Sequence, residues 1–271
     1  MRFATKSLLT TAVSTLALSS GWAADGDYGD ACECKIGDIG KRVIPIVIRD
    51  FKASHPDFEA FIGEDYGIVE RELGSDGRPV YASDSDTETT TGKYNFDQWY
   101  RNVEQVNIAI PLSLQLTEIA PNVWEYSNSS FFPIDNMGWD DPILRSDEIT
   151  SLNGWFQPEG GWGGWKPKPE DKINGHNYHF TLETHLKFDY NGGEVFTFRG
   201  DDDLFVYING ILAIDIGGVH GVIERTISLD DIADDLGIDV GNRYSFDLFF
   251  AERHTTESNF KFQTSINLQC L

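Results

Sequence analysis

Alternation of apolar and polar residues with a period of two constrains the fold of this chain more than any other feature of its sequence. The stretch "YSFDLFFAE" over 244–252 and the stretch "FKFQTSINL" over 260–268 both show it. The stretch "HNYHFTLETHLKF" over 176–188 places its large apolar side chains on one face: Phe180, Leu182, Leu186 and Phe188. Because successive side chains of a strand point to opposite faces, these three stretches predict half-buried β-strands.

Turn-forming pairs separate the strands at short intervals, among them Asn209-Gly210 and Gly217-Gly218. Residues 43–51 and 106–116 predict two further strands, and Pro111 places the second at an edge or a bulge. Helix signals are few; the best is "SLDDIADDLG" over 228–237, with Ser228 as the cap. The fold class expected is mainly β, an antiparallel two-sheet β-sandwich with one or two short helices.

The N-terminal residues predict secretion. Residues 1–23 combine basic residues, an apolar stretch and small residues near a cleavage site, which is typical of a signal peptide. Residues 24–42 then form a segment with a cysteine pair, and 43–271 a single sandwich domain. In an oxidising compartment Cys270 would pair with Cys32 or Cys34, and the sequence does not choose between them.

The charge of the chain limits its partners. Lys and Arg number 21 and Asp and Glu 44, for a net charge of −23. Such a chain repels nucleic acid and anionic membranes. No later stretch is long and apolar enough to span a bilayer, so the mature chain is expected outside the cytoplasm or at the cell surface.

Three consecutive carboxylates interrupt the strand pattern at Asp201, Asp202 and Asp203. Like charges this close repel one another, and a bound cation would offset that repulsion. Oxygen ligands on exposed loops suit calcium better than zinc. The alternative is a polar turn in which one aspartate accepts a hydrogen bond from its own backbone.

Several long motifs occur in order and carry a resemblance. They are "VIPIVIRDFKASHPDFE", "TTTGKYNFDQWYRNV", "SSFFPID", "HNYHFTLETHLKFDYNGGEVFTFRGDDDLFVYINGILAIDIGGVHG" and "FFAERHTTESNF". Together they resemble the fibro-slime domain of secreted bacterial and slime-mould proteins, from Val43 to Leu268. The second half is also similar to the wider sandwich family first described in anthrax protective antigen, which includes yeast flocculins.

The resemblance implies a calcium site that contacts sugar hydroxyls. In the flocculin branch a cis-linked Asp-Asp pair closes one loop, and this pair falls on Asp201 and Asp202. A second loop falls on 251–259, where Glu252 and Asn259 would complete the metal site. The residues expected to line the sugar site are Asp203, His220, Arg253 and His254.

A Gly-rich and Pro-rich loop over 153–171 holds Trp155, Trp162 and Trp165. Trp162 and Trp165 are candidates to stack on sugar rings, and the alternative is that these indoles cover the sheet. An ion pair between Glu252 and Arg253, with histidines capping turns, is likewise an open alternative to a polar binding mouth.

The sequence predicts a binding protein and no enzyme. It has no G-x-S-x-G, no H-E-x-x-H and no phosphate-binding glycine loop. We therefore expect a secreted, calcium-supported carbohydrate-binding or adhesion module that recognises cell-surface, fibre or matrix glycans. The alternatives are a self-associating extracellular matrix protein that forms fibres or slime, and an accessory module of a polysaccharide-degrading system.

Overall fold

The structure is a computed structural model that describes residues 40–59, 61–140, 176–255 and 257–270. The long strands are β1 (Lys41–Phe51), β3 (Asn107–Ala120), β4 (Val123–Asn128), β5 (Phe180–Asp189), β6 (Val195–Gly200), β7 (Leu204–Ile208), β8 (Ile211–Ile216), β10 (Ile223–Ser228), β11 (Arg243–Glu252) and β12 (Phe260–Thr264). The short strands are β2 (Gly63–Glu64), β9 (Gly218–Val219) and β13 (Gln269–Cys270), and the helices are α1 (Lys93–Phe96), α2 (Leu229–Leu236) and the 3₁₀ turn η2 (Gly138–Asp140).

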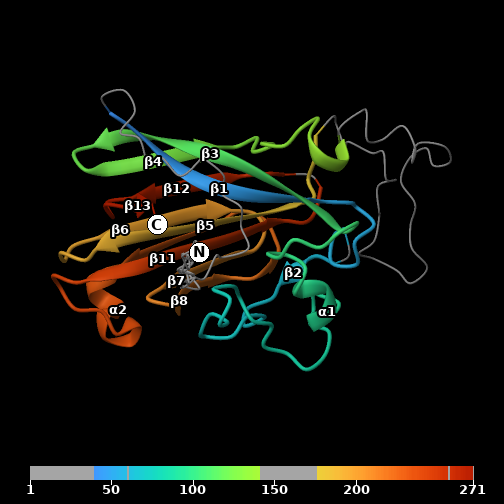
Figure 1. Cartoon of the computed structure of the whole chain (residues 1–271), viewed down its shortest axis with the longest axis horizontal. Helices are drawn as coiled ribbons and strands as arrows, with labels where there is room; N and C mark the ends of the chain where they lie inside the picture. The colour runs from blue at the N-terminus through green and yellow to red at the C-terminus, as the bar shows by residue number, and fades with distance from the viewer. Residues whose placement is uncertain (1–39, 60, 141–175, 256, 271) are drawn as a thin grey trace, which may run out of the picture.

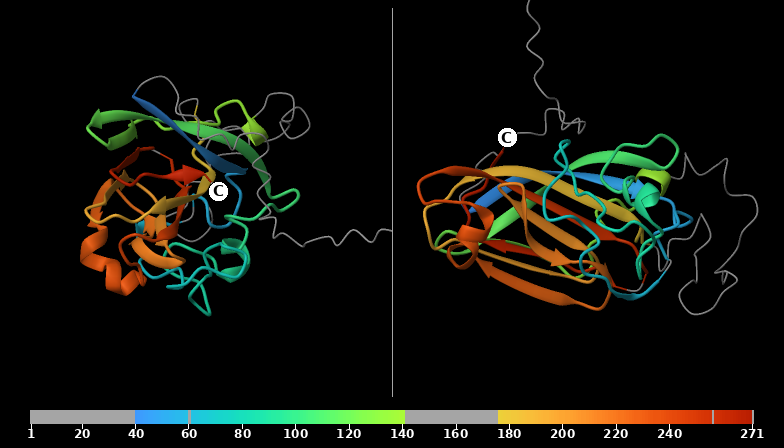
Figure 2. Two further views of the ribbon diagram at one scale, coloured as in Figure 1. Left: turned by 60° about the vertical axis from the view of Figure 1, so that its left-hand side comes forward. Right: turned by 90° about the horizontal axis from the view of Figure 1, so that it is seen from below.

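The long strands form one antiparallel hydrogen-bonded path in the order β10-β6-β12-β4-β3-β1-β5-β11-β7-β8 (Figure 1). This path folds over on itself. Phe196 of β6 packs on Phe246 of β11 with 5.3 Å between ring centroids, although these strands are far apart in the path. Phe250 of β11 likewise packs on Phe260 of β12 at 5.2 Å. The expected mainly β, antiparallel sandwich is therefore confirmed, and Figure 2 shows it from two further sides.

The main core lies between the two layers. It contains the apolar face predicted for 176–188, namely Phe180, Leu182, Leu186 and Phe188, all completely buried. It also contains Phe246, Leu248 and Phe250 from β11. The period-two pattern therefore identified the correct inward face of both strands.

A second apolar cluster lies on the opposite face of β7 and β11. Phe205, Tyr207 and Phe249 point there and are covered by residues of the segment 52–106, which includes α1. The main contributors from this segment are Phe96, Trp99 and Tyr100. Figure 1 shows the segment beside β7 and β8. The sheet is thus apolar on both faces here, and residues 52–106 form a third layer.

Two local predictions, for Pro111 and for the ends of α2, can be compared with the structure. Pro111 lies in β3 opposite Val47 of β1, whereas β4 pairs only with β3 residues from Thr117 onward. Pro111 therefore sits in a stretch with one neighbour, as the missing N–H requires. Helix α2 ends at Gly237 in the left-handed conformation (φ 63°), as predicted, but the Ser228 side chain makes no capping hydrogen bond.

The third layer buries a charged network on the outward face of β5. Glu183 accepts hydrogen bonds from Arg49 at 3.0 Å and Arg78 at 3.4 Å. His185 bonds to Asp247 at 2.7 Å and lies 3.7 Å from Glu183. Burial acts to lower the pKa of His185, but the two carboxylates outweigh it and raise the pKa to about 9. Burial acts to raise the pKa of Glu183, but His185 and Arg49 outweigh it and lower the pKa to about 2.

This network predicts a loss of stability in alkali. A histidine whose folded-state pKa is raised stabilises the fold below its ordinary pKa of 6.5, and this stabilisation is lost as pH rises through about 9. Urea unfolding at pH 6, 8 and 10 should therefore show a free energy of unfolding that falls less steeply in His185→Gln than in the parent. The half-exposed His176, paired with Asp135, provides the control His176→Gln. Parallel pH profiles for parent and His185→Gln would contradict the assignment.

Candidate functional site

The three aspartates lie where β6 ends and β7 begins. Leu204 of β7 pairs with Phe250 of β11, so Asp203 lies beside the C-terminal end of β11 and its Glu252. The His220 amide donates to the Asp201 carbonyl at 3.1 Å, and the Ala251 amide donates to the Asp203 carbonyl at 2.9 Å. The structure therefore brings the predicted aspartate loop, the 217–220 loop and the 251–259 loop together.

Asp203 is fully buried against Arg253. The Arg253 guanidinium donates to both Asp203 carboxylate oxygens, at 2.6 and 3.1 Å. It also donates to the carbonyls of Asp57 and Thr89 and to the Thr89 hydroxyl. The guanidinium also lies over the Trp99 ring, with its Cζ atom 4.6 Å from the ring centroid. Arg253 and Asp203, expected to contact a ligand, are thus fully buried, and Arg253 bonds entirely within the protein, holding the third layer to the site.

Asp201 and Asp202 are buried with fewer compensating charges. Asp202 accepts hydrogen bonds from the Arg253 amide at 2.6 Å and the His254 amide at 3.1 Å. Asp201 accepts from the Asn259 amide and from the Asn259 side chain at 2.9 Å. Burial raises the pKa of Asp201, and it raises the pKa of Asp202 well above its ordinary value although the Arg253 charge opposes the shift.

Glu252 is the least compensated acid of the site. Its side chain is completely buried, and neither carboxylate oxygen has a hydrogen-bond partner within the described ranges. The Ser258 hydroxyl, which acts to lower the pKa of Glu252, donates its hydrogen bond to the Phe131 carbonyl. Burial, followed by the charges of Asp202 and Asp201, raises the pKa of Glu252 well above its ordinary value. The open alternative of an ion pair between Glu252 and Arg253 is not observed, because Arg253 pairs with Asp203.

Glu59, from the third layer, is an acid of this site to which sequence analysis gave no role. Its carboxylate accepts from the Thr255 amide at 3.0 Å and bonds to His179 at 2.9 Å. His254 lies 3.5 Å from it and also bonds the Thr255 carbonyl. Glu59 belongs to the quoted motif "SHPDFE", so a signal was present, but a polar residue beyond a strand does not reveal which loop it meets.

The histidines differ in their surroundings. Nδ1 of His220 bonds the Gly221 carbonyl at 2.9 Å, while its Nε2 is buried and has no partner among the described residues. His254 is partly exposed, bonds the Thr255 carbonyl of its own loop and lies 3.5 Å from Glu59 of the third layer. Both lie beside the aspartates, as predicted.

One expectation about the site is wrong. The peptide bond between Asp201 and Asp202 is trans, as is every peptide bond in the described ranges. The cis linkage was transferred from flocculins by resemblance. Trp162 and Trp165, expected to stack on sugar, lie outside the described residues, as do Cys32 and Cys34.

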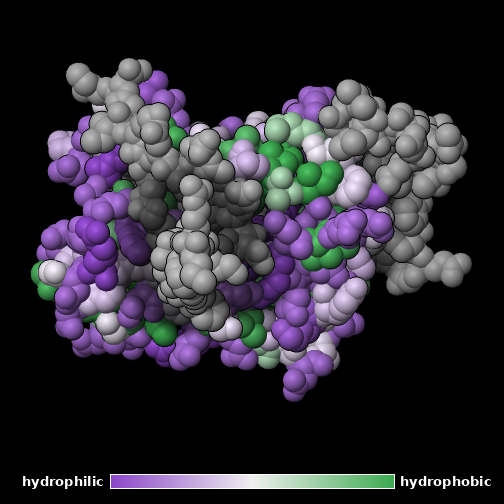
Figure 3. Space-filling view, in the orientation of Figure 1, coloured by the Kyte–Doolittle hydropathy of each residue, from purple (hydrophilic) through white to green (hydrophobic). Residues whose placement is uncertain are grey.

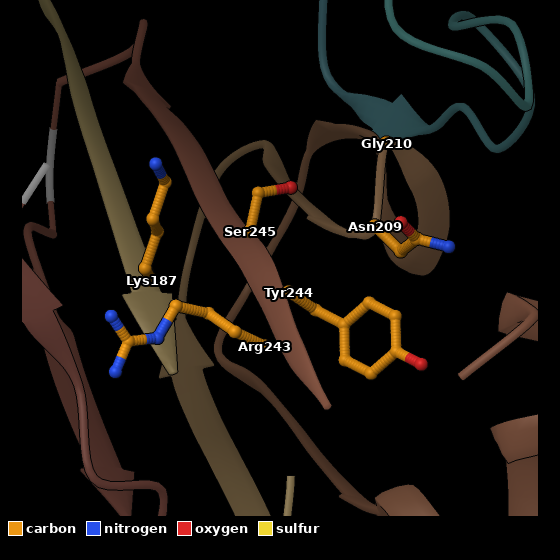
Figure 4. A pocket seen from close by; sticks show the side chains of 6 residues that line it. All are labelled: Lys187, Asn209, Gly210, Arg243, Tyr244 and Ser245. Carbon is orange, nitrogen blue, oxygen red and sulfur yellow. The ribbon is translucent and has the colours of Figure 1, made fainter. Parts of the chain in front are cut away.

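An open hollow of about 550 Å³ lies elsewhere, where β11 begins. Lys187 and Arg243 reach to one side of β11 and Tyr244 to the other (Figure 4). Because Glu252 is the last residue of β11, this hollow lies at the far end of that strand from the aspartates. Arg243 is paired there with Asp189 at 2.7 Å.

The comparison with known families fits this geometry. Residues 157–270 match the PA14 domain. This match spans strands β5 to β13 and therefore all three aspartates and the 251–259 loop. PA14 domains are carbohydrate-binding or adhesion modules, and they are typically extracellular or at the cell surface. Neither helix of the described ranges has the length and apolar composition needed to cross a membrane.

Similarity to curated proteins extends beyond the PA14 match. Protein psiD of Dictyostelium discoideum is 36% identical over 243 residues, which is 86% of this chain and 43% of psiD. Protein psiR of the same organism is 38% identical over 230 residues, 83% of this chain and 21% of psiR. The chain thus spans less than half the length of each of these relatives. The expected resemblance to the fibro-slime family is compatible with these matches, although they do not carry that name.

Two solved PA14 domains are similar in structure at low identity. One is described as a PA14 sugar-binding domain from an RTX adhesin, with 13% identity, a TM-score of 0.24, and coverage of 38% of this chain and 55% of that one. The other is the PA14 domain of the MpAFP antifreeze protein, with 12% identity, a TM-score of 0.27, and coverage of 76% and 80%.

Proposed function

We propose that this chain is a secreted carbohydrate-binding and adhesion module, without catalytic activity, whose binding loops are completed by a calcium ion. The observation that carries the proposal is the buried acidic cluster of Asp201, Asp202 and Glu252, with Glu252 lacking any hydrogen-bond partner in the described part of the chain. The PA14 match over the same residues supports the carbohydrate class of ligand.

The donor atoms of the cluster suit calcium. Carboxylates, together with the side-chain amide oxygen of Asn259, are hard oxygen ligands of the kind that calcium takes from loops. A buried and unbonded carboxylate costs several kcal/mol, on the order of the desolvation penalty of one ion, and a cation would offset that penalty. Within the described residues, no three His, Cys, Asp or Glu side chains yet converge on one point as a metal centre requires. We therefore propose that calcium draws Asp202 and Glu252 together, with Asp201 and Asn259 beside them.

A bound calcium would supply a positive charge to sugar hydroxyls that its protein ligands leave exposed. The protein residues position the binding loops. Arg253 holds the 251–259 loop to Asp203, and Glu59 bonds the Thr255 amide and the ring of His179. His220 and His254 lie where they would select the hydroxyl pattern.

The edges of the sheet favour a binder over a fibre-forming protein. The free side of β8 is covered by the third layer: Leu212 donates to the Arg71 carbonyl at 2.8 Å, and Glu72 bridges Ile211. At the other edge, β10 exposes Glu224, Arg225 and Thr226. Covered or charged edges oppose strand-to-strand association, so self-assembly through the sheet is disfavoured.

A paired experiment tests the proposal. We expect the purified protein to bind neutral oligosaccharides on a glycan array in calcium, to lose this binding in chelator, and to sediment as the same species in both buffers. Individual affinities should be weak, because a shallow, wet site is costly to desolvate. Calcium-dependent polymers without glycan preference would instead support the matrix protein, and equal glycan binding in chelator would remove the role of calcium.

A further inference from the structure

A short strap of chain lies beside the loops of the acidic site, and it is defined here as residues 61–65. Just before it, the Glu59 amide donates to the Arg253 carbonyl at 2.9 Å. At its other end, Gly63 pairs with Val219, and the Asp65 amide donates to the Gly217 carbonyl at 2.7 Å. The strap therefore runs between the two loops that flank the aspartates, 217–220 and 251–259.

The strap lies directly on glycine backbone. A Cβ atom at Gly217 would collide with the Asp65 carbonyl, and one at Gly218 with the Gly63 carbonyl. Gly218 also has a φ of 111°, a conformation that L-residues rarely adopt. These contacts fix the position of the strap beside the site by main-chain packing, so its side chains are presented from a rigid support.

Two large apolar side chains on this strap face solvent. Phe61 is 46% exposed and Ile62 is 65% exposed, whereas most large apolar side chains of the described residues lie in the two cores. In the space-filling view, hydrophobic atoms near the position of β2 are surrounded by hydrophilic surface (Figure 3). An apolar patch next to a polar site is the usual arrangement of a small-molecule pocket, in which a few polar groups orient a ligand and apolar groups bury it.

We propose that Phe61 and Ile62 form the apolar wall of the glycan site, an inference that rests on the proposed function. A pyranose ring has hydroxyls at its rim and C–H groups on its faces. The acidic loops and their cation would take the hydroxyls, and the strap would take a C–H face. The ligand class is then a neutral hexopyranose with one ring face free of axial hydroxyls, because an axial hydroxyl would lose its hydration against Phe61.

Single substitutions test this assignment on a panel of glucose-, galactose- and mannose-based oligosaccharides. We expect Phe61→Ala and Ile62→Ser to weaken binding about tenfold, as for other central apolar contacts, and Phe61→Tyr to retain it. The matched control is Val240→Ser, which alters a 63% exposed aliphatic residue near the start of β11, a strand about 30 Å long that ends at the site.

The shift in melting temperature on adding calcium separates the two proposals. It should be the same in Phe61→Ala as in the parent, because the strap provides none of the proposed ligands. If the parent binds the panel and Phe61→Ala binds it equally well, the apolar wall is refuted while the proposed function stands. If the parent binds no oligosaccharide of the panel, the proposed function fails and the wall fails with it.

Discussion

Calcium should raise the melting temperature of this protein by about 5–10 °C at pH 8, when its concentration is about a hundredfold above its dissociation constant. That concentration contributes about 2.7 kcal/mol, and about 1 kcal/mol shifts the melting temperature by 2–4 °C in a domain of this size. The pKa values of Asp202 and Glu252 are raised, so the calcium-free fold binds protons more tightly than the unfolded chain. The contribution of these two acids to the free energy of unfolding therefore falls as pH rises above about 4, and the gain from calcium grows over the same range.

The variant Glu252→Gln tests the effect of the buried charge independently of the shape of the side chain. It keeps the shape of the side chain but removes the charge that has no hydrogen-bond partner in the described ranges. Without calcium at pH 8 we expect it to be more stable than the parent, because the buried acid whose pKa is raised no longer has to ionise or to take up a proton. It should also lose the calcium-induced shift. The control Asp234→Asn removes one exposed charge from α2 and should keep that shift. A calcium shift of the same size at pH 5 and pH 8 would contradict this account.

Arg253→Met should destabilise the protein by about 3–5 kcal/mol, the usual consequence of removing one partner of a buried ion pair. Asp203 would keep a buried carboxylate with the Gly218 amide as its one donor among the described residues, and Thr89 and the Asp57 carbonyl would lose their hydrogen bonds to the guanidinium. The measurement is urea unfolding followed by tryptophan fluorescence. Arg243→Met removes the exposed pair with Asp189 and should have little effect.

The double variant Asp203→Asn with Arg253→Met keeps this prediction testable if the single variant folds poorly. Neutralising Asp203 removes the unpaired charge, so we expect the double variant to be more stable than Arg253→Met alone. A double variant less stable than both single variants would show that hydrogen bonding to the third layer, and not the charge pair, dominates.

Much of the sandwich follows from the sequence because strand periodicity is local. The alternation at 180–188 and 244–250 identified the inward faces correctly, and the Gly237 stop identified the end of α2. The burial of the outward faces could not be predicted in this way. Thr181 and Glu183 look like the solvated side of a strand, yet both are almost completely buried, because Trp99 and Arg78 of the distant segment 52–106 bond to them. Burial by a distant irregular segment has no local signature.

For the candidate site, the sequence predicted which residues are neighbours but not which way their side chains point. Spacing and resemblance brought Asp201, Asp202, Glu252 and Asn259 to one place, and the structure agrees that these residues are neighbours. Whether Arg253 pointed outward or inward could not be read from "AERHTT", because its partners Thr89 and Asp57 lie in another part of the chain. The prediction of a cis peptide bond was wrong because it came from the resemblance to flocculins and not from the residues of this chain.

The cover formed by residues 52–106 has a consequence for the modular organisation of the chain. The PA14 match at 157–270 includes Phe205, Tyr207 and Phe249, whose outward sides are packed against Trp99, Tyr100 and their neighbours. A fragment confined to that match would expose this aromatic surface and leave the Arg253 guanidinium without its acceptors on Asp57 and Thr89. We therefore expect a fragment of residues 157–270 to be less stable than the chain that also contains residues 52–106.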